Sequence, residues 1–175
     1  MRAEHVIPVI VALVMVAGLV MFIVKMNPSS QTQPSTITIG NEYSNYQLES
    51  IDGEIFTLSE YTGNIIVIEF MRTDCPHCNE FLPTFKEFCR RYRDKGVVFI
   101  TVSLEPIDRL SSYAKMKGMD WIVARDMTGG LAVALGVKYV PTVVIIDRDG
   151  SVYKTLIGTQ SLKDLENALL PLLQE

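Results

Sequence analysis

Residues 65–78 read IIVIEFMRTDCPHC, an apolar run that leads directly into two cysteines three residues apart. Apart from Glu69, residues 65–71 are apolar on both faces of a strand, which is typical of a strand inside a covered sheet. A helix is predicted to follow, because Pro76 suits the first helical position and apolar residues then recur at helical spacing. Cys75 is therefore predicted to lie where a buried strand passes into a helix.

The two cysteines predict a redox couple. At the start of a helix, Cys75 faces unpaired backbone N–H groups and the positive end of the helix dipole, and both favour thiolate over thiol. Cys78 follows by nearly one turn, so the two Cα atoms fall within the bridging range of about 4.4–6.8 Å. An exposed thiolate with a shielded partner is what a reversible dithiol–disulfide pair needs. We expect a Cys75–Cys78 disulfide, with Cys75 as the nucleophile and Cys78 as the resolving thiol.

Other uses of the cysteines are open alternatives. Two cysteines three apart can be half of a zinc site, but the remaining candidates are Cys89 and His5, and His5 borders a predicted membrane segment. We therefore expect no metal and no cofactor, and Cys89 is predicted to be a core residue. A peroxide-reducing cysteine is a further possibility, although it would not need Cys78 so close in sequence.

The rest of the pattern alternates between strands and helices and predicts an α/β domain. Further strands are predicted at residues 97–103, 142–146 and 152–157, with a hairpin around Asp52-Gly53 that joins residues 46–48 and 55–58, and a short extended segment at 121–124. Helices are predicted from the cysteine pair to Gly96, at 108–117, at 128–135, and after Ser161, whose partner Asp164 suggests a capping box. This order favours a mixed central sheet with helices on both faces.

The N-terminal part differs from this domain. Residues 6–24 carry no charge, and at about 1.5 Å per residue they span about 28 Å of helix, close to a hydrocarbon core of about 30 Å. We therefore predict a transmembrane anchor at residues 1–26, a linker rich in serine, threonine and proline at 27–40, and a folded domain at 41–175. A long cleaved signal peptide is the alternative. The net charge of −4 argues against a nucleic-acid partner.

Several further residues match a known family, and they are spread over most of residues 41–175. They are Asp52-Gly53 with Phe56-Thr57-Leu58, the strand that ends at Phe70, Pro83 five residues after Cys78, the loop 136–142 that contains Pro141, the turn 146–150, and Gly158. On these residues the domain resembles the thioredoxin fold, and most closely that of membrane-anchored TlpA-like thiol–disulfide oxidoreductases. Residues 97–121 are longer than in plain thioredoxin, which fits the TlpA-like insertion.

The resemblance assigns roles to individual residues. It implies a cis peptide bond at Pro141, a Val140 backbone that pairs with an extended substrate, and a Gly158 that lets the substrate approach. Glu69 is predicted to be buried by its strand pattern, and in thioredoxins an acid at this place helps to deprotonate the second cysteine. Glu69 is therefore expected to be the general base for Cys78. The alternative is a glutamate that reaches the sheet edge and stays solvated.

The resemblance also suggests a cellular role. TlpA-like proteins mostly act outside the cytoplasm as reductants of protein disulfides, often in cytochrome c maturation, and take electrons from a CcdA/DsbD-type membrane protein. We expect the same of this chain, as a single-pass protein of the cell membrane with an extracytoplasmic catalytic domain.

Two positions depart from thioredoxin. Asp74 replaces a tryptophan and should oppose thiolate formation at Cys75. Pro76-His77 resembles the pair in DsbA-type oxidases, and His77 is predicted to stabilise the Cys75 thiolate when protonated, with an exposed spacer as its alternative. A disulfide-forming oxidase is therefore the second candidate function. A copper metallochaperone is a weaker one, because the chain lacks the additional cysteine spacing and distal histidine of that class.

Overall fold

The computed structural model describes residues 42–174. The predicted anchor at residues 1–26 and the linker at 27–40 lie outside the described residues and stay predictions. Within the described part of the chain, no helix combines the length and the apolar character needed to cross a membrane.

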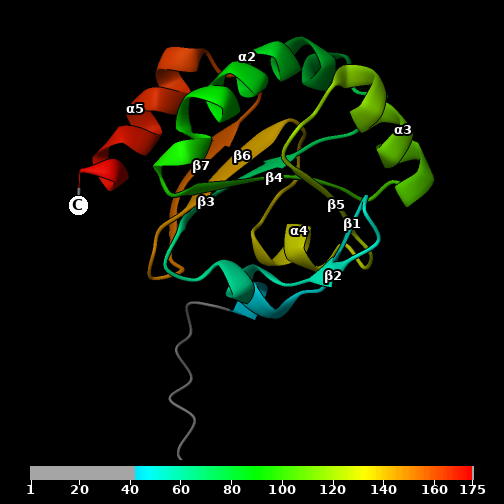
Figure 1. Cartoon of the computed structure of the whole chain (residues 1–175), viewed down its shortest axis with the longest axis horizontal. Helices are drawn as coiled ribbons and strands as arrows, with labels where there is room; N and C mark the ends of the chain where they lie inside the picture. The colour runs from blue at the N-terminus through cyan, green and yellow to red at the C-terminus, as the bar shows by residue number, and fades with distance from the viewer. Residues whose placement is uncertain (1–41, 175) are drawn as a thin grey trace, which may run out of the picture. The chain divides into compact units, whose positions relative to one another are not determined.

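The described domain is built on one seven-stranded mixed sheet (Figure 1). The strands lie in the order β2-β1-β5-β4-β3-β6-β7. Their bounds are β1 Leu48–Ser50, β2 Ile55–Phe56, β3 Ile65–Phe70, β4 Val97–Ser103, β5 Ile122–Asp126, β6 Thr142–Ile146 and β7 Val152–Ile157. β3 pairs in parallel with β4 and antiparallel with β6, so β3 lies inside the sheet, as the apolar run predicted.

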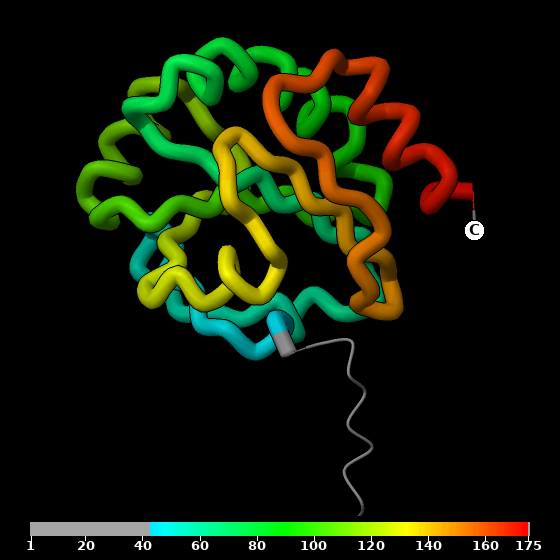
Figure 2. Tube along the Cα trace, turned by 180° about the vertical axis from the view of Figure 1, so that it is seen from behind, coloured from blue at the N-terminus to red at the C-terminus, as the bar shows by residue number. Residues whose placement is uncertain are grey.

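Helices cover both faces of this sheet, which confirms the predicted thioredoxin-like α/β architecture. The helices are η2 Glu42–Asn45, η3 Leu58–Tyr61, α2 Pro76–Tyr92, η4 Arg93–Lys95, α3 Ile107–Lys117, α4 Gly130–Ala134 and α5 Leu162–Leu173. α2 and α5 pack on one face and α4 on the other, while α3 contacts β5. Figure 2 views the domain from behind and shows α4 and the chain that leads from it into β6.

Most predicted boundaries are confirmed within a few residues. β4, β6 and β7 begin and end where the pattern placed them, and Ser161 with Asp164 forms the predicted capping box of α5. The short segments differ more. The second hairpin strand, predicted at 55–58, ends at Phe56 because η3 begins at Leu58, and the helix predicted at 128–135 covers Gly130–Ala134. The segment predicted at 121–124 is a full strand, β5, which pairs with both β4 and β1. The first hairpin strand begins at Leu48 rather than at residue 46, because its register is set by pairing with Phe56 and Asp126.

The two faces of β3 belong to two separate core clusters. Ile65 and Val67 pack with α2 and α5, whereas Ile66 and Ile68 pack with the opposite cluster under α4. Side chains alternate between faces along a strand, so Glu69 lies on the α2 side together with Ile65 and Val67. β3 ends one residue before Met71, and the chain then reaches Cys75 at the start of α2. The sheet thus positions a buried acid beneath the helix that carries the cysteines.

Candidate active site

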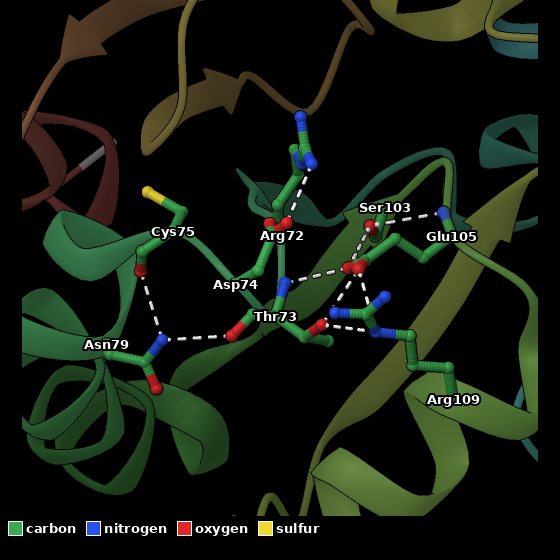
Figure 3. A network of polar contacts seen from close by, with 8 residues as sticks. All are labelled: Arg72, Thr73, Asp74, Cys75, Asn79, Ser103, Glu105 and Arg109. Carbon is green, nitrogen blue, oxygen red and sulfur yellow. Dashed lines mark hydrogen bonds and ion pairs between the residues drawn. The ribbon is translucent and has the colours of Figure 1, made fainter.

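Cys75 caps the N-terminus of α2. Its backbone is extended, with φ −80° and ψ 117°, and Pro76 is the first helical residue. The Cys78 backbone N–H donates a hydrogen bond to Cys75 Sγ at 3.2 Å. Cys75 itself is half-buried, and its sulfur points away from the polar residues around it in Figure 3. The sulfur is thus accessible and already receives a donor that would stabilise a negative charge.

Cys78 is the shielded member of the pair. It is only 1% exposed and packs against Met71, Leu82 and Tyr113. Burial, followed by its hydrogen bond with Cys75, raises the pKa of the Cys78 thiol to about 12. Cys78 therefore holds its proton at neutral pH, and it needs a base before it can attack a sulfur. Both cysteines are present as free thiols, as is Cys89, which lies fully in the core as predicted.

The loop before β6 lies beside the first sulfur. The Val140–Pro141 peptide bond is cis, as the resemblance implied. The Val140 carbonyl oxygen is 3.8 Å from Cys75 Sγ, across 65 residues of sequence. Directly after the neighbouring strand β7, the Gly158 N–H donates to the Pro141 carbonyl at 2.8 Å, and Gly158 has a φ of +84°, which favours glycine. A peptide chain that approaches Cys75 would therefore meet the Val140 backbone.

Glu69 is buried, as its strand pattern predicted, with 1% of its surface exposed. Burial raises its pKa from an ordinary 4.5 to about 7, although a hydrogen bond from Thr101 partly opposes the shift. The charge of Glu69 in turn contributes to the raised pKa of Cys78. A thiol that must lose a proton thus lies within electrostatic reach of a buried carboxyl whose pKa is about 7.

A polar network that the sequence did not reveal holds the loop before Cys75 (Figure 3). The Glu105 carboxylate accepts the backbone N–H of Thr73 and its hydroxyl, both at 2.7 Å, and forms an ion pair with Arg109 at 3.1 Å. From the other side, Asn79 Nδ2 donates to the carbonyl oxygens of Thr73 and Cys75, both at 3.0 Å. Glu105 follows β4 by two residues, so its place beyond the end of a parallel strand was the one available signal.

Replacing Glu105 with alanine is expected to destabilise the domain by about 2 kcal/mol, because the Thr73 N–H loses a charged acceptor in a largely buried place. Chemical denaturation of the full chain would measure this. Glu80→Ala is the matched control, since its contact with the His77 ring is between two exposed side chains and contributes little. Equal losses from the two substitutions would contradict the structural role of Glu105.

Two predicted electrostatic influences on Cys75 have other partners in the structure. The His77 ring, predicted to lie near the Cys75 sulfur, is exposed, and the contact shown for its Nδ1 is with Glu80 Oε2 at 3.5 Å. This geometry corresponds to the exposed-spacer alternative. Asp74 forms an ion pair with Arg72 at 2.8 Å, which offsets the negative charge that was expected to oppose the thiolate. Neither the contact of His77 with Glu80 nor the ion pair of Asp74 with Arg72 was predicted from the sequence.

An accessible sulfur at a helix N-terminus, a shielded second thiol and a cis-proline loop beside them define a thiol–disulfide oxidoreductase of the thioredoxin fold. Comparison with known proteins agrees. A family model described as the AhpC/TSA family matches residues 39–155, more than half of the chain, and the chain belongs to that family.

Curated relatives and solved structures are consistent with this class. The chain is 28% identical to thiol-disulfide oxidoreductase ResA of Bacillus thuringiensis subsp. konkukian over 139 residues, which cover 79% of this chain and 80% of the relative. It is 29% identical to the ResA of Bacillus cereus (strain ATCC 10987) over 132 residues, covering 75% and 76%. A thioredoxin-family thiol:disulfide interchange protein from Chlorobium tepidum shares the fold, with a TM-score of 0.66, 22% identity and coverage of 77% of this chain and 97% of that one.

Proposed function

We propose that this protein is a membrane-anchored, extracytoplasmic reductase of protein disulfides, of the TlpA-like type, which acts through Cys75 and Cys78. The observation that carries the proposal is the asymmetry of the pair. Cys75 Sγ is accessible beside the Val140 backbone, whereas Cys78 is a buried thiol whose pKa is raised to about 12. The anchor rests on the uncharged run at residues 6–24, and a CcdA/DsbD-type membrane protein is the proposed electron donor.

The reaction consists of two exchanges of sulfur. The Cys75 thiolate attacks one sulfur of a substrate disulfide, a mixed disulfide forms, and the other substrate sulfur leaves as a thiolate that takes up a proton. Cys78 then gives its proton to Glu69 and attacks Cys75 Sγ. The bond to the substrate breaks, the second substrate sulfur leaves as a thiolate and is protonated, and the Cys75–Cys78 disulfide forms. The substrate gains two electrons, and the protein must regain two from its donor.

The surroundings of Cys75 favour the reducing direction over the oxidase alternative. A strongly oxidising pair needs a reduced form that is stabilised by its thiolate. The imidazole of His77, which would supply that stabilisation, contacts Glu80. The ion pair with Arg72 works the other way, because it offsets the Asp74 charge that would have opposed the thiolate, and it keeps the expected potential intermediate. Reference potentials run from about −270 mV for thioredoxin to about −120 mV for DsbA, so we expect a value between about −250 and −160 mV.

Two measurements test this proposal. The first is the reduction potential of the full chain in detergent, by equilibration with glutathione. The second is the redox state of Cys75 and Cys78 in intact cells, by thiol trapping, and we expect a largely reduced pair that becomes oxidised when the candidate donor is deleted. A pair that stays oxidised regardless of the donor would replace the reductase by the oxidase. Peroxide consumption by the reduced protein would detect the peroxidase alternative, and copper titration would detect the metallochaperone alternative.

A further inference from the structure

A chain of two hydrogen bonds leads from a tryptophan to the buried acid. Thr101 Oγ1 donates to Glu69 Oε2 at 2.8 Å, and Trp121 Nε1 donates to Thr101 Oγ1 at 2.9 Å. Thr101 is fully buried and is the register partner of Glu69 in the parallel β3–β4 pair. Trp121 is half-buried directly before β5, and its ring packs edge-on against Phe85 of α2, with the ring centroids 5.8 Å apart.

The order of donors in this chain fixes where the hydroxyl proton points. An indole N–H can only donate, and a threonine hydroxyl has a single proton. Because Trp121 occupies the acceptor side of the Thr101 oxygen, the Thr101 proton is directed to Glu69. A hydrogen bond donated to a carboxylate favours its ionised form, which opposes the effect of burial on the same group.

We propose that Thr101 and Trp121 are a positioning pair that holds the hydroxyl proton on Glu69, so that the carboxylate form of this buried acid is favoured and can accept the Cys78 proton. The inference rests on the proposed role of Glu69 as the base for Cys78. It assigns Trp121 a part in the reaction although, among the described residues, its indole N–H donates to Thr101 and not to a cysteine. Because Trp121 directly precedes β5, the proposal also links this strand to the active site.

The other groups that face Glu69 do not titrate in the same range. On α2, burial raises the pKa of Cys78 to about 12 and raises that of Cys89 as well. On α3, burial raises the pKa of Tyr113 to about 12, and Glu69 contributes to it. β6 places Val143 opposite Glu69, and α5 contributes apolar residues to this core. Asp120, next to Trp121, forms an ion pair with Arg93 that lowers its pKa, so it stays ionised.

The indole proton provides a direct test, because Trp121 is the single tryptophan of the whole chain. In the reduced full-length protein, its indole N–H resonance should shift with an inflection near pH 7 as Glu69 ionises. His77→Gln is used as the background, since imidazoles also titrate between pH 5 and 8. The inflection should be absent in Glu69→Gln and in Thr101→Val. An indole resonance that does not respond to Glu69, or that titrates unchanged in Thr101→Val, would overturn the proposal.

The rate of the Cys78 step provides the second test. Reduced protein mixed with Ellman's reagent should release thionitrobenzoate in two phases, first by Cys75 and then by Cys78. Loss of a hydrogen bond to a charged group should move the acid limb of the second phase up by about one pH unit in Thr101→Val. The second phase would then be about fivefold slower at pH 7, while the first phase stays unchanged. Trp121→Phe should shift the limb in the same direction, and Thr101→Ser should restore it.

The control and the arms of this experiment separate two kinds of failure. Thr155→Val makes the same chemical change at an exposed position of β7 and should leave both phases unchanged. If Glu69→Gln slows the second phase but Thr101→Val does not shift its limb, the positioning pair is wrong and Glu69 remains the base. If Glu69→Gln has no effect on the second phase, the proposed base itself is wrong, and the positioning role fails with it.

Discussion

Replacing Cys78 with serine should leave Cys75 covalently trapped on its substrates, whereas Cys75→Ser should abolish disulfide exchange altogether. The reason is the division of tasks between the two sulfurs. Cys75 Sγ is accessible and receives the Cys78 N–H, while Cys78 is buried and protonated. Without Cys78 the mixed disulfide cannot be resolved from within the protein, so it accumulates. Non-reducing electrophoresis of cell extracts, followed by release with a reductant, would measure it.

Cys89 supplies the matched control for this prediction. It is fully buried in the core and burial raises the pKa of its thiol, so Cys89→Ser should neither trap substrates nor reduce exchange. Alkylation of the reduced protein gives an independent measure of the same order of attack. We expect Cys75 to be labelled first by a wide margin, and labelling of Cys78 ahead of Cys75 would refute the assignment.

The sequence was sufficient for the parts of the fold that depend on local patterns. β3 and β4 are continuous apolar runs, and α2 follows a proline at its first position, so burial and helix propensity place them without tertiary information. The burial of Glu69 follows from its place in β3, on one face with Ile65 and Val67. The cis bond before Pro141, by contrast, was implied by the resemblance alone, since few X–Pro bonds are cis.

The contacts that the sequence could not show join residues far apart in the chain. Thr101 meets Glu69 because β3 and β4 pair in one particular register, and two runs that are apolar on both faces do not determine that register. Glu105 reaches Thr73 for the same reason, one loop further on. Trp121 packs against Phe85, but the partner of its N–H could be found only with knowledge of the β4–β5 pairing.

Glu69→Gln should slow the Cys78 step by about a hundredfold near pH 7, which is the lower range of what a positioned general base contributes. The wild-type rate should rise with pH through about 7, because Glu69 must be ionised to accept the proton. The variant should lack this rise, and the two rates should converge toward high pH as hydroxide deprotonates Cys78. Stopped-flow measurement of the second thionitrobenzoate phase tests this, and unchanged turnover from pH 6 to 9 would exclude the role.

Glu69→Gln should make the folded protein more stable near neutral pH although it slows the Cys78 step. This difference separates a loss of chemistry from a loss of fold. The pKa of Glu69 is about 7 in the folded protein against an ordinary 4.5, so between these values the folded state binds a proton that the unfolded state has lost. The free energy of unfolding should therefore fall as pH rises from 4.5 through 7, by about 3 kcal/mol at most. Glutamine has no charge to bury and should remove this decline.

Denaturation of both proteins at pH 5 and pH 8 measures this difference. We expect the variant to be relatively more stable at pH 8 and yet slower in the Cys78 step. That result would show that Glu69 is retained for its proton and at a cost in stability. Parallel pH dependence in the two proteins would mean that the carboxylate is solvated in the folded state.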